Sequence, residues 1–368
     1  MFDFSNFLKS GALLRHIDLK SSNPRIWTLA SGPFSISEFH NNDELSICWP
    51  DFYFQPTSQK LNYYSTLNQT QLTTQELKEL CINFLNNLKK SDSNAKKTSE
   101  WNWSSLNQHH FLESYHQIQK DIAHGDVQKA VLSLFAKSQN TPNSRERVEI
   151  LLKLIELPFE MHVFGFWTPE KGVLGATPEI LFEREGHYLK SMSLAGTRIK
   201  KNFAQDLLLD SKELQEHQWV IEEIKKNLSL WGEVQQSKTE VLVLPQLEHL
   251  QTLFSVQLND PQISHEEILK ALHPTPALGA FPKNYVTQKM IQFPEQEHRW
   301  GFGAPLSFLF PNQKWLSLVT IRSLLWNSNS SQIGVGCGIV KESQKEKEWL
   351  ELNAKYKSIL MNLGLEHE

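Results

Sequence analysis

The chain has 368 residues, 40% of them hydrophobic, which is enough for one large domain or two ordinary ones around a sizeable core. Its 37 basic and 41 acidic residues give a net charge of −4, so we expect neither nucleic acid nor an anionic membrane as a partner. Three cysteines without metal-binding spacing indicate a reducing compartment. We expect no signal peptide and no membrane-spanning segment, and therefore a cytoplasmic location.

The N-terminal part, to about residue 70, is predicted to form short strands separated by turns. Thr73 and Glu76 then form a capping box, and the apolar spacing from Leu77 to Leu88 predicts an amphipathic helix. Residues 89–100 are rich in Lys, Ser and Asn and have no periodicity, which is typical of a loop or linker.

The rest of the chain alternates helical and strand-like segments. We expect a helix at 111–124 that ends at Gly125, strands at 127–135 and 163–167, a helix at 210–228 and a hairpin at 315–340. Strands and helices are both abundant without regular βαβ alternation. This pattern favours an α+β fold on mostly antiparallel sheet.

Lys129 lies in the strand predicted at 127–135, on the same face as Val127, Val131 and Phe135. Burial in an apolar row disfavours the charged form of a lysine, so the pKa of Lys129 would fall toward the range in which an amine acts as a base. The alternative is a strand-end lysine whose ammonium reaches water.

Glu179 follows Pro178, which fixes a turn, and precedes three apolar residues. Partial burial would raise the pKa of its carboxyl enough for proton donation near neutral pH. An ordinary turn glutamate is the alternative. Downstream, Gly196 and Thr197 offer a glycine and a hydroxyl that suit close approach of a substrate, although a simple turn is equally compatible with them.

Two further candidates follow between residues 210 and 280. Glu216, beside His217 on the helix predicted at 210–228, is a candidate carboxylate ligand. His273 opens the rigid segment His-Pro-Thr-Pro, which either presents the imidazole to a ligand or packs it within a proline-fixed loop.

The C-terminal part places Arg322 before a strand in which Gly334, Gly336 and Gly338 alternate. Glycine within a strand often marks a place where a ligand approaches the backbone, and the N–H groups there could bind a carboxylate. Ser343 and a glutamate three residues later predict a capping box and a helix that begins near residue 344.

On that helix, Glu348, Glu351 and Lys355 share one face. Two carboxylates one turn apart repel unless a cation joins them, and oxygen ligands suit a hard ion such as Mg²⁺. The alternative is a solvated face of Glu–Lys pairs.

Together these stretches resemble the chorismate-utilising enzymes, which include isochorismate synthases, salicylate synthases, anthranilate synthase component I and aminodeoxychorismate synthase component I. The resemblance implies an α+β fold of two packed, mostly antiparallel sheets surrounded by helices. Residues 111–362 would form the chorismate-binding catalytic core, and residues 1–110 a strand-rich N-terminal part of the same fold.

The resemblance also implies roles for the candidates. Lys129 and Glu179 would be catalytic. The residues implied to bind Mg²⁺ are Glu216, Glu348 and Glu351, and those implied to bind the substrate are Gly196, Thr197, His273, Arg322, Gly336 and Lys355.

Lys129 bears on which reaction of the family is carried out. In this family a lysine at its position accompanies water as the nucleophile, whereas ammonia-using anthranilate synthases carry a glutamine. Water has to be deprotonated as it attacks C2 of chorismate, which requires a base. Glu179 would protonate the C4 hydroxyl as it leaves. The resemblance therefore implies a Mg²⁺-dependent isochorismate synthase of menaquinone or siderophore biosynthesis without a glutaminase subunit. We expect a monomer, because the assigned functions need no second subunit.

Three positions depart from the family pattern: Arg198 after Ala-Gly-Thr, Ser307 where a glycine is usual, and Cys337 where a small residue is common. They leave other members of the family open. These are a salicylate synthase, which would go on to eliminate pyruvate, and an ammonia-using synthase subunit. A non-catalytic chorismate-binding protein is the alternative from another class.

Overall fold

The structure is a computed structural model. It describes residues 11–16, 26–31, 47–48, 52–55, 60–63, 70–91, 100–168, 170–200, 207–296, 299–309 and 314–366. In these residues no helix is long and apolar enough to cross a membrane.

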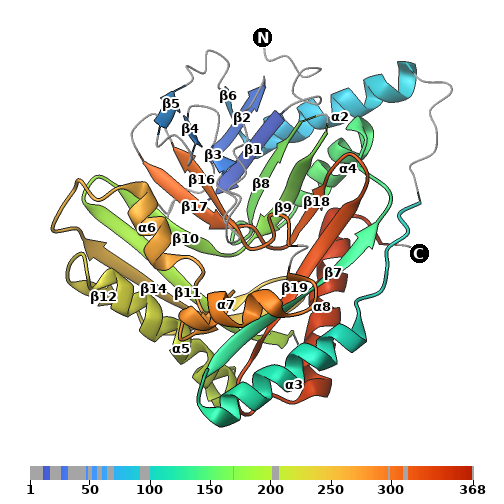
Figure 1. The fold of residues 1–368 in the computed structure, drawn as a ribbon. Coiled ribbons are helices and arrows are strands. Elements are labelled where there is room, and N and C mark those ends of the chain that lie inside the picture. The colour runs from blue at the N-terminus through green and yellow to red at the C-terminus, as the bar shows by residue number, and fades with distance from the viewer. Residues whose placement is uncertain are drawn as a thin grey trace.

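Two sheets form the body of the molecule (Figure 1). In the described residues one sheet has nine strands in the order β15-β7-β19-β18-β9-β8-β1-β2-β6, and all its neighbours are antiparallel. Its strands are β1 (Gly11–His16), β2 (Ile26–Ser31), β6 (Thr70–Leu72), β7 (Lys129–Ser138), β8 (His162–Trp167), β9 (Gly172–Thr177), β15 (Ala280–Phe281), β18 (Ser323–Trp326) and β19 (Ser331–Ile339).

The second sheet has eight strands in the described residues, in the order β12-β14-β11-β10-β17-β16-β3, with β13 also paired to β14. Only the pairing of β16 with β3 is parallel among these. Its strands are β3 (Ile47–Cys48), β10 (Ile180–Glu185), β11 (Tyr188–Ile199), β12 (Val234–Gln236), β13 (Glu240–Val243), β14 (Leu247–Gln257), β16 (Pro305–Leu309) and β17 (Trp315–Val319); β4 (Phe52–Gln55) and β5 (Lys60–Tyr63) form a separate hairpin. The prediction of an α+β fold on mostly antiparallel sheet is confirmed.

Helices cover the outer faces of the two sheets. The apolar cluster on one side of the nine-stranded sheet includes residues of α2 (Thr74–Ser91), α3 (Gln108–His124), α4 (Ser144–Leu154) and α8 (Lys345–Leu363). The cluster of the eight-stranded sheet includes α5 (Ser211–Leu228) and α6 (His265–Leu272). Short elements complete the fold: α7 (Asn284–Gln288), η1 (Leu207–Leu209) and η2 (Met290–Gln292).

The sheets pack on each other through a third apolar cluster. It joins side chains of β8 and β9 to side chains of β10, β16 and β17, among them Phe164, Phe166, Ile180, Phe308 and Leu318. Burial of such side chains is the main favourable term in folding. The shared core fixes the two sheets relative to each other, and with them the elements that carry the candidate residues.

The predicted helices are largely confirmed. Glu76 accepts hydrogen bonds from the backbone and hydroxyl of Thr73, so the capping box before α2 is present. α3 begins at Gln108, three residues earlier than expected, because Asn107 caps it. It ends at Gly125, which has a φ of 83°. α5 matches the helix expected at 210–228, with Asp210 as its N-cap.

Three local predictions are wrong or only partly described. α2 continues to Ser91, so residues 89–91 of the expected loop are helical, and residues 92–99 lie outside the described residues. The hairpin expected over 315–340 is confined to β18 and β19, because β17 pairs with β10 and β16 in the other sheet.

Ser343 does not cap α8, which is the third correction. The helix begins at Lys345, and its N-cap Gln344 makes no side-chain capping bond. The hydroxyl of Ser343 instead accepts a hydrogen bond from Val340 N at 3.1 Å. It therefore holds the turn between β19 and α8, and the expected capping box is absent.

Candidate active site

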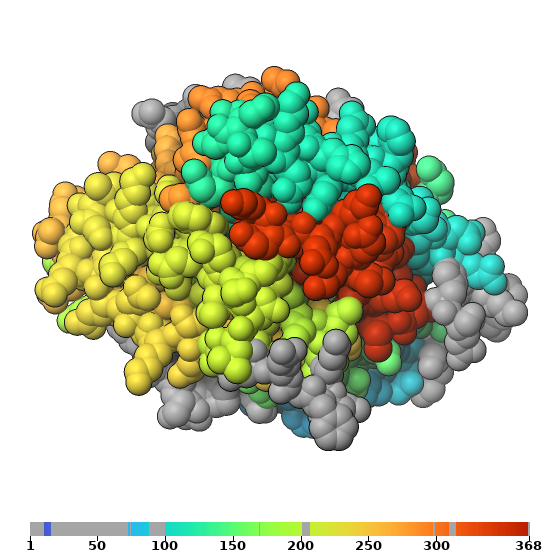
Figure 2. Space-filling model, turned by 90° about the horizontal axis from the view of Figure 1, so that it is seen from below, coloured from blue at the N-terminus to red at the C-terminus, as the bar shows by residue number. Residues whose placement is uncertain are grey.

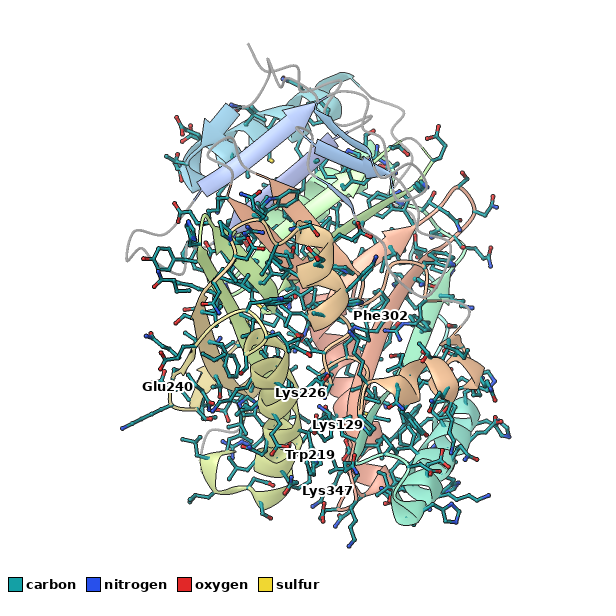
Figure 3. The ribbon with its side chains drawn as sticks, turned by 60° about the vertical axis from the view of Figure 1, so that its left-hand side comes forward. Lys129, Trp219, Lys226, Glu240, Phe302 and Lys347 are labelled. Carbon is teal, nitrogen blue, oxygen red and sulfur yellow. The ribbon has the colours of Figure 1, made fainter. Side chains whose placement is uncertain are left out.

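Lys129 lies where β7 faces the first turns of α5, and Figure 3 shows its side chain between this helix and the strands. Its side chain is fully buried, and its Nζ lies 3.1 Å from Glu216 Oε1. Burial lowers the pKa of Lys129, while the carboxylate of Glu216 opposes the shift. The inward orientation predicted from the strand pattern is confirmed, and the ammonium reaches a carboxylate instead of bulk water.

Gly338 of β19 makes room for this pair. A Cβ atom at Gly338 would lie 2.2 Å from Glu216 Oε1 and 2.9 Å from Lys129 Cε, which is too close for either contact. A side chain at this position would therefore displace the carboxylate or the amine. Of the three alternating glycines, Gly338 is the one that the Lys129–Glu216 pair requires.

Glu179 and Glu216 line one cavity, together with Thr197, His249, Arg322 and Lys355. Glu179 is buried where β9 leads into β10, and its backbone N–H donates to Thr177 Oγ1. Burial raises the pKa of Glu179 to about 7, although the positive charges of Lys129, Lys355 and Arg322 act in the opposite direction. The carboxyl can therefore carry a proton near neutral pH.

Arg322 is held on the cavity wall by His249. The guanidinium NH2 lies 2.9 Å from His249 Nε2, and His249 Nδ1 lies 3.0 Å from Thr197 Oγ1. Because a guanidinium only donates, Nε2 accepts and Nδ1 carries the proton that it donates to the hydroxyl. Burial, and then the charge of Arg322, lower the pKa of His249, so the imidazole is neutral.

Arg322 also adopts a strained backbone, with a φ of 57°. Burial lowers the pKa of its guanidinium to about 10, while Glu351 and Glu179 act in the opposite direction. The side chain stays positively charged at neutral pH and faces the same cavity as Glu179. A positively charged fork at this place suits a carboxylate of a ligand.

Lys355 connects α8 to β19. Its Nζ donates to Gly336 O at 2.8 Å and lies 2.7 Å from Glu351 Oε1. The sequence led us to expect the backbone N–H groups near Gly336 to bind a carboxylate, whereas in the structure the Gly336 carbonyl accepts from Lys355. Gly336 and Lys355 both line the cavity, so they remain candidates for contact with substrate.

The first turn of α5 adds two residues that sequence reasoning missed, Lys212 and Glu213. Lys212 Nζ lies 3.0 Å from Glu213 Oε1, 3.4 Å from Glu216 Oε2 and 3.0 Å from Glu348 Oε1. Glu213 Oε2 accepts a hydrogen bond from Thr197 N at 2.8 Å. The i, i+4 spacing of Lys212 and Glu216 was a usable signal, since such pairs share a helix face.

The buried carboxylates of this cluster differ in charge state. Burial raises the pKa values of Glu213 and of Glu348 to about 7. Burial alone would also raise the pKa of Glu216, but the ammonium groups of Lys129 and Lys212 lower it below its ordinary value. A concentration of carboxylates at one place favours any cation that enters.

The side chains of this cluster have the chemistry that a divalent cation requires. All the donors are carboxylate oxygens, which a hard ion prefers. Glu348 Oε2 is buried and accepts no hydrogen bond from the part of the chain that the structure describes. The donor set of Glu216, Glu348 and Glu351 therefore fits a Mg²⁺ ion that retains several waters.

Another group of ligand side chains lies elsewhere, on and after α3. Ligand atoms of Asp121, His124 and Asp126 lie within 4.8 Å of one another. However, Lys289 Nζ already pairs with Asp121 at 3.1 Å and with Asp126 at 2.8 Å. The lysine neutralises this group, and nothing else there indicates a ligand.

Gly196 and His273 do not themselves line this cavity, and their contact with substrate stays a prediction. Gly196 has a φ of 74° at an irregularity of the β11–β14 pairing, and a Cβ there would lie 3.0 Å from Glu213 O. The glycine thus shapes the strand next to Thr197, which itself lines the cavity. His273 is buried at the end of α6 and does not line this cavity, although Ala277 and Leu278 of the following segment do. Among the residues that the structure describes, His249 is the histidine in the lining of this cavity.

The departures from the family pattern lie beside the cavity or make structural contacts. The hydroxyl of Ser307 lies 2.9 Å from His265 Nε2 and 2.8 Å from Ser317 Oγ, outside the cavity lining. Arg198 pairs with Glu248. Cys337 is buried, and burial raises the pKa of its thiol. None of the three removes a charged group from the cavity.

Comparison with known proteins identifies the family of the chain. A family model described as chorismate binding enzyme matches residues 36–364, which is most of the chain. The chain belongs to the chorismate-binding enzyme family. The family resemblance seen in the sequence is therefore confirmed, and with it the prediction of an enzyme family that binds chorismate.

Individual relatives and solved structures are also similar to this chain. The vibriobactin-specific isochorismate synthase of Vibrio cholerae is 30% identical over 269 residues, which are 70% of this chain and 65% of that protein. Solved structures of DhbC from Bacillus anthracis and of MenF, the menaquinone-specific isochorismate synthase of Escherichia coli, both align with a TM-score of 0.72. The DhbC structure is 22% identical, and the alignment covers 98% of this chain and 97% of that one. The MenF structure is 18% identical, and the alignment covers 98% of this chain and 91% of that one.

At identities of 22% and 18%, the similarity to these solved structures shows that the fold is the same. The aligned part of this chain spans less than two thirds of the length of the curated relatives that it matches.

Proposed function

We propose that the protein is an isochorismate synthase, which converts chorismate to isochorismate with water as the nucleophile. The observation that carries the proposal is a pair of buried groups with opposite tendencies beside one cavity, which is lined by Glu179 and by Glu216, the carboxylate that Lys129 contacts. Lys129 is a desolvated amine beside Glu216, and Glu179 is a carboxyl whose pKa burial raises to about 7. The family match and the V. cholerae relative support chorismate as the substrate.

The two groups would carry out complementary proton transfers. Water adds its oxygen to C2 of chorismate and gives a proton to the neutral amine form of Lys129, which burial favours over the ammonium. The ring double bonds shift, and the C4 hydroxyl leaves as water after it takes a proton from Glu179. Exchange of protons with solvent restores both side chains. One water enters and one leaves, so the overall reaction is an isomerisation.

Charged residues on the cavity wall would hold the two carboxylates of chorismate. Arg322 offers a planar fork of donors and Lys355 a point charge, and both face the cavity that Glu179 lines. The His249 imidazole fixes the orientation of the guanidinium through a 2.9 Å contact. Binding through such groups would set the ring between the amine and the carboxyl.

Mg²⁺ is part of the proposal. Glu216, Glu348 and Glu351 would hold the ion, which when bound would offset the charge of a substrate carboxylate and draw electron density from the ring. A chelator in excess over Mg²⁺ should therefore abolish turnover, and Glu351→Gln should raise the Mg²⁺ concentration that the enzyme needs.

Product analysis tests the proposal directly. Purified protein is incubated with chorismate and Mg²⁺, with and without ammonium, and the products are separated by chromatography and identified by NMR. We expect isochorismate at a rate independent of ammonium. Salicylate with pyruvate in the absence of any added lyase would show a salicylate synthase, and an aminated product would show an ammonia-using synthase.

A further inference from the structure

Lys212 contacts two of the three carboxylates that were assigned to Mg²⁺, Glu216 and Glu348. Its Nζ is within 3.4 Å of oxygens of Glu213, Glu216 and Glu348. Glu213 and Glu216 belong to α5 and Glu348 to α8, and Figure 2 shows these helices side by side on one face of the molecule. One ammonium is thus shared by three carboxylates from two helices.

The contacts of Glu216 show why this arrangement matters for a metal ion. Glu216 Oε1 lies 3.1 Å from Lys129 Nζ, and Glu216 Oε2 lies 3.4 Å from Lys212 Nζ. Both oxygens of this carboxylate therefore face an ammonium. A metal ion that takes Oε2 enters the space that Lys212 Nζ occupies, since Mg²⁺–oxygen distances are about 2.1 Å.

The contacts of Glu348 also place Lys212 where a metal ion would bind. Its Oε1 lies 3.0 Å from Lys212 Nζ, whereas its buried Oε2 accepts no hydrogen bond within the described ranges. In those ranges Glu216, Glu348 and Glu351 do not bring their oxygens within 4.8 Å of one another as a set of three. The oxygens of the three residues together are therefore farther apart than in the shell of a small ion, and Lys212 lies against two of the three carboxylates.

We propose that Lys212 is a tethered cation that competes with Mg²⁺ for the cluster and leaves it when the ion binds. The identity of the ion rests on the proposed function; the competition rests on the contacts of Lys212. The side chain starts from the first turn of α5 and is 18% exposed, so it can rotate toward solvent without movement of the helix. Lys212 would thereby weaken Mg²⁺ binding and prevent mutual repulsion of the carboxylates while no metal is bound.

Calorimetric titration of MgCl2 into the substrate-free protein tests this inference. Lys212→Met removes the ammonium and keeps a flexible side chain of similar length. We expect its Mg²⁺ Kd to be at least about tenfold lower than that of the wild type, since a positive charge within a few ångströms of the site is gone. Thermal unfolding gives a second readout: the metal-free variant should melt at a lower temperature, and saturating Mg²⁺ should raise its melting temperature more than that of the wild type.

Two matched variants control for charge. Lys347→Met removes one positive charge from α8. Lys347, which is labelled in Figure 3, is exposed and precedes Glu348 in the sequence. The Mg²⁺ Kd of this variant should stay within about twofold of the wild type. Lys212→Arg keeps the charge and should not tighten binding. If Lys212→Met does not fold, Lys212→Gln replaces it with the same expected direction.

The outcomes separate the two proposals. Tighter Mg²⁺ binding by Lys212→Met, with both controls near the wild type, supports the competition. If the wild type binds Mg²⁺ and Lys212→Met binds it equally well or more weakly, the competition is overturned and the proposed function stands. Absence of Mg²⁺ binding by the wild type and by Lys212→Met alike would remove the metal from the proposed function, and the competition with it.

Discussion

The proposed reaction requires Glu179 to be protonated before it donates a proton to the C4 hydroxyl. Burial raises the pKa of its carboxyl from the usual 4.5 to about 7, so the group keeps its proton up to that pH and loses it above. A general acid works only in its protonated form. We therefore expect kcat/KM for chorismate to fall as the pH rises through about 7.

The protonation of Glu179 can be measured without turnover. The difference between infrared spectra of the wild type and Glu179→Gln isolates the band of this carboxylic acid, which should disappear with a midpoint near pH 7. The same shift makes Glu179 lower the stability of the fold as the pH rises from 4.5 to about 7, because the buried group then has to ionise. A midpoint near 4.5 would exclude Glu179 as the acid.

Lys129 is expected to be needed for turnover more than for substrate binding. Lys129→Gln keeps a hydrogen-bonding group beside Glu216 but cannot take a proton from water. We expect turnover to fall by about a thousandfold, within the range for loss of a general base. Chorismate binding, measured by calorimetry in the presence of Mg²⁺, should stay within a few-fold. Equal losses of turnover and binding would make the lysine a structural residue or a substrate anchor.

The sequence predicted some residues of the site better than others. Lys129 could be recognised because the period of a strand places it in an apolar row, and the structure buries it fully. Lys212 and His249 were missed, since a charged residue at a helix start and a histidine in a strand have many ordinary uses. Their contacts with Glu348 and Arg322 join segments that lie far apart in the chain.

At the scale of elements, strand β19 determines how closely α5 approaches β7. Gly338→Ala would place a Cβ 2.2 Å from Glu216 Oε1 and so push the carboxylate away from Lys129. We expect kcat to fall by about a hundredfold, as is typical when a group at a reactive centre is displaced by an ångström. Circular dichroism should show that the fold is kept.

Gly125→Ala is the matched control for Gly338→Ala. Gly125 has a φ of 83°, and no atom lies within 4 Å of the position that an added methyl group would take. Alanine there therefore costs about 1 kcal/mol of stability through backbone strain alone. Its kcat should equal that of the wild type. If Gly338→Ala lost only as much stability as Gly125→Ala and kept full activity, the close approach at Gly338 would have no part in the reaction.

Element boundaries show where sequence signals are sufficient. α5 and the end of α3 were predicted closely because Asp210 and Gly125 are strong local signals. The hairpin at 315–340 was drawn too long because β17 and β18 are close in sequence but belong to different sheets. Which sheet a strand joins depends on long-range packing, and a local apolar pattern does not contain that information.

Arg15 joins the N-terminal strand β1 to the segment after α4 through side-chain hydrogen bonds. Its guanidinium donates to the carbonyls of Leu157, Pro158 and Met161 at 2.9, 3.1 and 2.8 Å. Arg15→Met would leave these acceptors without the donor, and we expect the free energy of unfolding in urea to fall by about 3 kcal/mol. Arg145→Met, which breaks an i, i+4 surface pair with Glu149, should change it by less than about 0.5 kcal/mol.

The fold class followed from the sequence because abundant strands without βαβ alternation leave few arrangements. The sequence did not reveal how the first strands take part. β1 pairs with β8 and extends the nine-stranded sheet, a contact between segments about 150 residues apart in the chain. The division at residue 110 into an N-terminal part and a catalytic core stays a prediction.

The central claim is that this protein adds the oxygen of water to C2 of chorismate. Turnover of chorismate with Mg²⁺ in ¹⁸O-labelled water, followed by mass spectrometry and NMR of the product, tests it most directly. We predict isochorismate with one ¹⁸O atom, located in the C2 hydroxyl. Unlabelled isochorismate, or chorismate recovered unchanged under conditions in which the protein binds it, would contradict the claim.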